Sequence, residues 1–131
     1  MYAKRLWVIF IIGLAGALPA AQKKPKPPDV EIVEAVAHRG ESIISINGRV
    51  RNTGERPIKQ LVLSFTFFAP GKQPVTTQKT EIDEELLDKG QEATFRVELQ
   101  APPRSVEFSV DASDTAGHLF RVGKPGPFPI E

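Results

Sequence analysis

Two aspartates and a serine in one short segment are the first candidates for a ligand site in this chain. Asp111, Ser113 and Asp114 precede Gly117, and Ca²⁺ prefers oxygen ligands such as theirs. Alanines occupy two positions where a calcium loop would carry further ligands, and no glutamate closes the segment. Aspartate and serine also favour turns by bonding to their own backbone. We therefore expect a turn over residues 111–117, with a calcium or small-ligand site there as the alternative.

Other catalytic and metal-binding patterns are missing from the sequence. His38 and His118 stand far apart, so they do not form the local ligand pair typical of zinc sites. The chain has no cysteine, which excludes disulfides, thiolate metal sites and a cysteine nucleophile. Glycine-rich nucleotide motifs and the nucleophile elbow of serine hydrolases are absent as well. We expect a protein that is not an enzyme and uses no metal or other cofactor.

Acidic residues gather between positions 81 and 92, in and around the one stretch (83–89) with any helical character. They are Glu81, Asp83, Glu84, Glu85, Asp88 and Glu92. Paired carboxylates can hydrolyse glycosides, but they need a cleft that a loop on a small domain does not offer. A solvated acidic loop is the expectation, and an electrostatic docking edge for a basic partner is the alternative.

Three polar residues on one expected strand are candidates for a partner-binding surface. Asn47, Arg49 and Arg51 alternate with inward positions and so share an outward face, which could also be simply solvated. Arginine is frequent among the residues that dominate protein interfaces. Phe68 and Phe128 complete the set, because the only Trp and Tyr lie within the first 21 residues. If those residues are cleaved off, the protein keeps no Trp or Tyr on which a sugar ring could stack, so the expected partner is a protein.

The N-terminus has the pattern of a secretory signal peptide. Lys4 and Arg5 precede an apolar run over residues 6–18, and small residues follow at positions 20 and 21. The run is shorter than the roughly 20 residues that span a bilayer, so an uncleaved anchor is the less favoured alternative. We expect a signal peptide over 1–21, a Pro/Lys-rich linker over 22–28, and a secreted or periplasmic protein of a bacterial envelope. The net charge of +1 gives no general affinity for nucleic acid.

Hydrophobic periodicity predicts an all-β domain over residues 29–122. Apolar and polar residues alternate in four segments, at 43–52, 61–68, 93–99 and 106–112. Further strands are expected at 30–37, with a bulge or a bend after Ile32, at 75–82, as a polar edge, and at 118–122. Six or seven short strands with Pro/Gly turns favour an immunoglobulin-like two-sheet antiparallel sandwich. Residues 123–131 form a Pro/Gly-rich tail that cannot join a central strand, and we expect it to be disordered or to bind a partner.

One stretch of the chain resembles a known family. Ile46-Asn47-Gly48-Arg49-Val50-Arg51-Asn52-Thr53-Gly54 is similar to the G-x-V-x-N-x-G opening of FxLYD-type domains. The segment 65–69 (FTFFA) stands where the name motif belongs and keeps only its first residue. Leu87-Asp88-Lys89-Gly90 and Phe95-Arg96-Val97 resemble the family's L-x-x-G and F-x-V patterns. The resemblance covers residues 43–114 and implies a small exported bacterial β-sandwich with a role in adhesion or assembly; the oligomeric state stays open.

Overall fold

The computed structural model describes residues 27–131, so the expected signal peptide and most of the linker lie outside the described residues. This part of the chain is all-β, with eleven strands and no helix. Its six long strands are β2 (Val30–Arg39), β3 (Ile43–Asn52), β5 (Leu61–Ala69), β6 (Gln73–Glu81), β8 (Glu92–Gln100) and β9 (Glu107–Asp114). Five two-residue strands are β4 (Ile58–Lys59), β7 (Leu86–Leu87), β10 (Leu119–Phe120), β11 (Val122–Gly123) and β12 (Phe128–Pro129).

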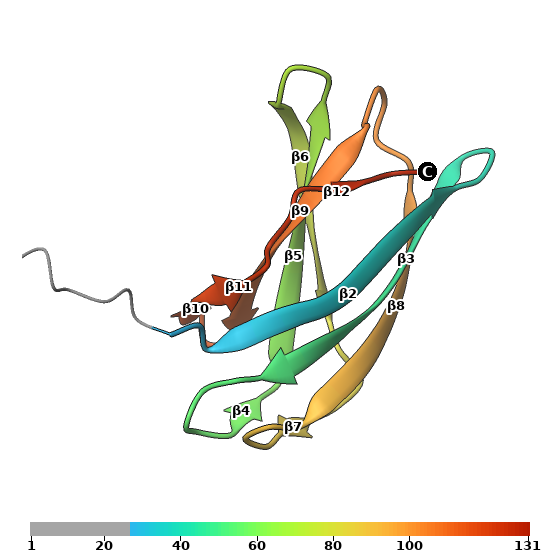
Figure 1. Ribbon diagram of the computed structural model, residues 1–131. Coiled ribbons are helices and arrows are strands. Elements are labelled where there is room, and N and C mark those ends of the chain that lie inside the picture. The colour runs from blue at the N-terminus through green and yellow to red at the C-terminus, as the bar shows by residue number, and fades with distance from the viewer. Residues whose placement is uncertain (1–26) are drawn as a thin grey trace, which may run out of the picture.

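Two sheets pack face to face, which confirms the expected sandwich (Figure 1). One sheet has the strand order β11-β2-β3-β8, and the other has the order β10-β9-β5-β6 with β12 also paired to β9. The long strands pair antiparallel, whereas β11 runs parallel to β2. Strands β4 and β7 form a separate small ladder at one end. At the other end, the β2–β3 and β5–β6 hairpins diverge.

The alternation read from the sequence decides which side of each strand is buried. In β3 the side chains of Ile44, Ile46 and Val50 are fully buried, while Asn47 between them is exposed. The bulge expected after Ile32 is present, as a register shift between β2 and β3. Side chains alternate between the two faces of a strand, so one extra residue changes which positions face inward. The shift therefore lets apolar side chains in the C-terminal part of β2 point into the core again.

Three details of the sequence analysis are corrected by the structure. The stretch with helical character contains the two-residue strand β7 and no helix. Val106, placed on the inner face by its alternation with Phe108, is 44% exposed because β9 begins only at Glu107. The C-terminal tail, expected outside the sandwich, is ordered and paired with both sheets.

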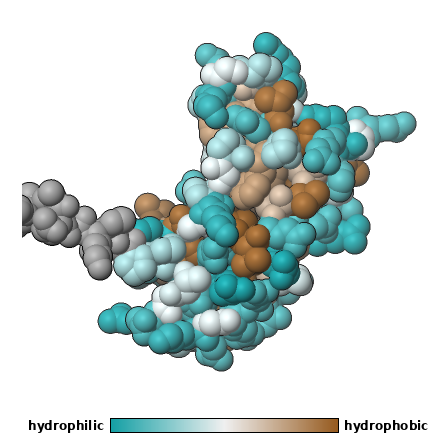
Figure 2. Space-filling view, in the orientation of Figure 1, coloured by the Kyte–Doolittle hydropathy of each residue, from teal (hydrophilic) through white to brown (hydrophobic). Residues whose placement is uncertain are grey.

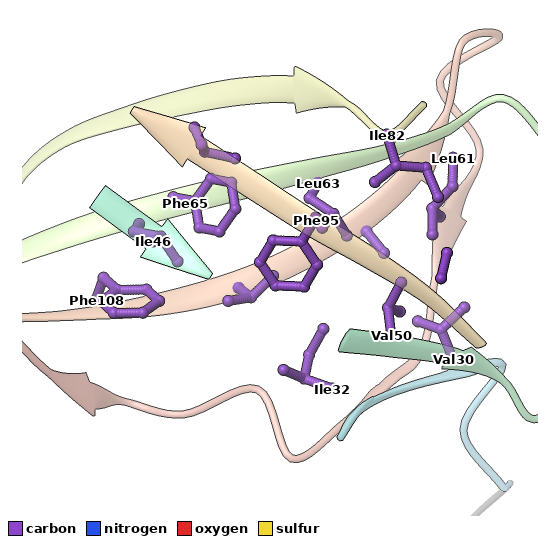
Figure 3. Close-up of a cluster of buried hydrophobic side chains, with 14 of the residues drawn as sticks. Val30, Ile32, Ile46, Val50, Leu61, Leu63, Phe65, Ile82, Phe95 and Phe108 are labelled. Carbon is purple, nitrogen blue, oxygen red and sulfur yellow. The ribbon is translucent and has the colours of Figure 1, made fainter. Parts of the chain in front are cut away.

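Aromatic rings fill the middle of the core. Phe65 of β5, Phe95 of β8 and Phe108 of β9 point into the space between the sheets (Figure 3). The Phe65 ring centroid lies 6.1 Å from both other rings, in tilted contacts typical of aromatic clusters. Gly48 makes room for this cluster, since a Cβ there would overlap the Glu34 carbonyl oxygen and lie 2.5 Å from Phe95 Cζ. Close packing against Glu34 and Phe95 therefore explains why position 48 is a glycine.

The C-terminal segment closes one side of the sandwich. After β10 the chain crosses to pair with β2 through β11, then returns to β9 through β12 (Figure 1). At its end, the Ile130 amide donates to the Val106 carbonyl (3.0 Å) and the Glu131 amide to the Ala37 carbonyl (3.0 Å). These bonds join the edges of β9 and β2, one from each sheet. On this side neither long strand has a fully open edge.

The described residues contain no helix long and apolar enough to cross a membrane.

Candidate functional site

Arg49 and Arg51 lie on the outward face of β3, as expected, but neighbouring glutamates hold both of them. Arg49 donates from Nε to Glu34 Oε1 and from Nη1 to Glu92 Oε1, each at 3.1 Å. Arg51 donates from Nε to Glu92 Oε2 at 3.1 Å, and its Nη2 bonds the same oxygen. Glu92 on β8 and Glu34 on β2 thus bracket β3 from both sides.

The ion-pair network extends to the C-terminal segment through Glu31. Lys124 Nζ lies 3.1 Å from Glu31 Oε2, and Arg51 Nη1 lies 3.8 Å from Glu31 Oε1. The hydrogen bond from Arg51 holds the pKa of Glu92 below its ordinary value of 4.5, and the same bond raises the pKa of Arg51. Three acids therefore balance three bases in this network. A partner that used the arginines would have to replace these contacts.

A shallow hollow lies beside this network on the same face. It measures about 530 Å³ and is lined in part by Asn47, Val36, His38 and Arg96. The Arg96 side chain is 73% exposed and has one ion-pair contact, at 3.6 Å from Glu98. Asn47 is thus accessible to a partner, in a surface that Arg49 and Arg51 border.

The two phenylalanines predicted to bind a partner lie elsewhere. Phe128 packs on Phe108 with ring centroids 5.4 Å apart, so it belongs to the closed side of the sandwich. Phe68 is half-buried on the outer face of β5, where it lines a hollow of about 130 Å³ with Pro127 and Lys72. The five predicted residues therefore do not form one site: three lie on one sheet, Phe68 on the other, and Phe128 is structural.

The 111–117 segment ends in a turn, and its oxygen ligands are not brought together. Asp114 Oδ1 accepts hydrogen bonds from the amides of Ala116 (3.0 Å) and His118 (2.9 Å), and its Oδ2 lies 2.9 Å from His118 Nδ1. The bonds from His118 lower the pKa of Asp114. Asp111 and Ser113 lie on the opposite face of β9 from Asp114. Residues 27–131 hold no cluster of three potential metal-binding side chains. Nothing in this geometry favours the calcium alternative.

The acidic stretch divides into two parts. Asp83, Glu84 and Glu85 are exposed between β6 and β7, as in a solvated loop, whereas Glu92 belongs to the ion-pair network.

Within residues 27–131, exposed apolar side chains do not gather into one docking face. The large ones in this part of the chain are Val36, Ile43, Val75, Leu86, Val106 and Leu119. They come from six different parts of the chain, and Figure 2 shows hydrophobic residues mixed with hydrophilic ones across the middle of this view. Single exposed apolar residues of this kind are common on soluble domains.

The feature that sequence reasoning missed is the contrast between the two sides of the sandwich. Opposite the side closed by the C-terminal segment, β6 and β8 are the last strands of their sheets. Within residues 27–131, neither strand pairs along its outer edge. The sequence predicted β6 as an edge strand, which is confirmed. Its N-terminal part is protected by Pro74 and by the register shift at Phe67/Phe68, so the accessible stretch is 76–81.

Comparisons with known proteins identify no family and find only distant structural likenesses. No family model and no curated protein matches the chain. Among solved structures, the C-terminal domain of wzt is 10% identical with a TM-score of 0.48, over 78% of each chain. A calcium-binding mutant of Bacteroides uniformis β-glucuronidase 2 is 19% identical over 70% of this chain (TM-score 0.46), and Thermotoga neapolitana β-glucosidase 3B is 18% identical over 78% (TM-score 0.42). The chain spans 12% and 17% of those two enzymes.

Proposed function

We propose that this protein is an exported, non-enzymatic interaction module that binds a protein partner in the bacterial cell envelope by strand addition to β6. The observation that carries the proposal is the asymmetry of the sandwich. The C-terminal segment closes the β9/β2 side, while β6 ends its sheet and, among residues 27–131, has one edge of its backbone unpaired. An unpaired edge is a template for an extended segment of another chain, and main-chain hydrogen bonds supply the affinity.

Strand β6 is better suited to this role than β8. Asp83, which follows β6, lines the same hollow as Thr94 and Arg96, so the chain after β6 crosses beside the first half of β8. The second half of β8 carries the Arg96–Glu98 ion pair and is followed by Pro102. Residues 76–81 of β6 instead alternate Thr and Gln with Thr, Lys and Glu, and carry no proline. Polar side chains keep this edge soluble and leave its backbone accessible.

Lysines at positions 76 and 80 should abolish partner binding. Thr76 and Thr80 pair with Phe67 and Leu63 and are half-buried on the inner face of the sheet, so a charge there would be covered by an added strand. We expect the double variant Thr76→Lys/Thr80→Lys to reduce in-cell crosslinking to the partner about tenfold or more. Mass spectrometry of adducts from the exported protein measures this yield.

The matched control is Ser42→Lys/Ala116→Lys, which adds the same charge at two exposed turns. It should retain the adduct. Equal adduct yields from wild type and the edge variant would exclude strand addition at β6, because the change blocks that edge alone.

A further inference from the structure

Two opposite charges lie in one row on the outer face of the β9-β5-β6 sheet, and neither has a partner among residues 27–131. Lys79 of β6 and Asp111 of β9 are both exposed, and both pair in register with Ser64 of β5. Strands lie about 4.8 Å apart, so β5 keeps the two side chains on opposite flanks of one row, about 10 Å from each other. No hydrogen bond or ion pair among residues 27–131 involves either side chain, in contrast to the network on the other sheet. The Lys72–Glu107 pair (3.5 Å) lies on the same sheet, near its other end.

The arrangement of these charges is self-complementary. A two-fold axis parallel to β5, lying above the face, places β6 of one copy opposite β9 of another. Ser64 then meets Ser64 of the second copy, and Lys79 meets Asp111 of the second copy in the same row. The symmetry repeats the contact, so two opposite-charge pairs form per dimer. From this register we propose that two copies of the protein associate face to face through the outer surface of the β9-β5-β6 sheet.

The rest of the face fits the same arrangement. The next row has Thr66 on β5 between Thr77 and Ser109, so its side chains are small. In the row on the other side, Glu81 of β6 lies opposite Ser113 of the second copy, so no like charges meet there. Phe68 lies one row further and is half-buried, with Pro127 beside it. In the dimer its ring would face Phe68 of the second copy, and aromatic burial there would add to the two ion pairs.

This dimer goes beyond the proposed binding at β6 and is compatible with it. The contact uses the face of the sheet, whereas strand addition uses the edge of β6. The two-fold axis places the two β6 edges on opposite sides of the assembly. A dimer would therefore present two binding edges, and such a pair raises the avidity for a repeated or dimeric partner.

Charge reversal at Lys79 and Asp111 tests the dimer contact directly. In Lys79→Glu, and equally in Asp111→Lys, two like-charge contacts replace the ion pairs, so each variant alone should dimerise about tenfold more weakly or worse than wild type. Mixing the two variants restores both ion pairs in the heterodimer, as does combining the substitutions in one chain. Sedimentation velocity of the full chain as cells produce it, alone and in 1:1 mixtures, measures these equilibria.

The control variants are Lys59→Glu and Asp83→Lys, which reverse exposed charges outside this face. They should dimerise as wild type does. A wild-type protein that stays monomeric at about 100 µM, a concentration well above the Kd of most specific dimers, would overturn the proposal. So would single variants that dimerise normally, or a 1:1 mixture that does not recover association. A wild-type protein that dimerises but captures no partner would contradict only the function proposed for β6.

Discussion

Replacing Asn52 with alanine is expected to lower the free energy of unfolding by about 4 kcal/mol, since buried groups lose their hydrogen-bond partners. Asn52 is fully buried at the end of β3. Its Nδ2 donates to the carbonyls of Arg56 (2.8 Å) and Leu87 (2.9 Å), and its Oδ1 accepts from the Gly54 amide (3.0 Å). One side chain thus joins the turn after β3 to β7. Alanine would leave the Arg56 and Leu87 carbonyls without this donor, while the Gly54 amide would keep its bond to the Asp29 carbonyl (3.0 Å).

Asn52→Asp is the more discriminating variant. The carboxylate keeps an acceptor for the Gly54 amide but places an oxygen against two carbonyls, so we expect a loss at least as large as with alanine. Denaturant unfolding measures the loss of stability in both Asn52 variants, with the exposed Asn47→Ala as control. A loss below about 1 kcal/mol for Asn52→Ala, the net value of a single ordinary hydrogen bond, would show that water replaces the side chain.

Deleting residues 125–131 is expected to destabilise the protein by about 4 kcal/mol or more, because it removes both hydrogen bonds and apolar burial. The deletion takes away the Pro125 carbonyl, which accepts from the Val110 amide at 2.9 Å, and Glu131, which bonds Ala37 and Arg39. It also uncovers the face of Phe108 that Phe128 contacts. The edge of β9 near Phe108 and the edge of β2 near Ala37 would open, while β10 and β11 would remain in place.

The matched variant for this deletion is Phe128→Ala, which keeps the backbone bonds. We expect it to cost about 2 kcal/mol, the scale for truncating a half-buried aromatic side chain. Thermal and denaturant unfolding of the two variants separate the contribution of the backbone hydrogen bonds from that of the Phe128 ring. If the deleted chain unfolded at the wild-type midpoint, the C-terminal segment would be peripheral, as its Pro and Gly content suggests.

The fold was largely predictable because one physical signal dominates the middle of this chain. Alternation with a period of two is required wherever a strand has one buried and one exposed face, and β3, β5, β8 and β9 all show it. The bulge in β2 was visible as a slip in the same pattern. The C-terminal segment has no such pattern. Its strands are two residues long and depend on the edges of β2 and β9, which the sequence around them does not show.

The candidate site was less predictable because its properties depend on pairing. Arg49 and Arg51 were correctly placed on an outward face, but the glutamates that hold them come from strands 15 and more than 40 positions away. Asp114 looked like a ligand because its type suits calcium, whereas its oxygens bond the turn that follows. The row that joins Lys79, Ser64 and Asp111 likewise exists only in the folded sheet.

Site-specific photo-crosslinking in living cells tests the strand-addition proposal most directly. A photoreactive residue is placed in turn at Gln78 on β6, at Asn47 on the outer face of β3, and at Ser42 in an exposed turn. Binding at the β6 edge predicts one discrete heterologous adduct from Gln78, lost on introducing Thr76→Lys/Thr80→Lys, and none from the other two positions. The same adduct from Asn47 with none from Gln78 would contradict strand addition and place the partner on the β2-β3-β8 face.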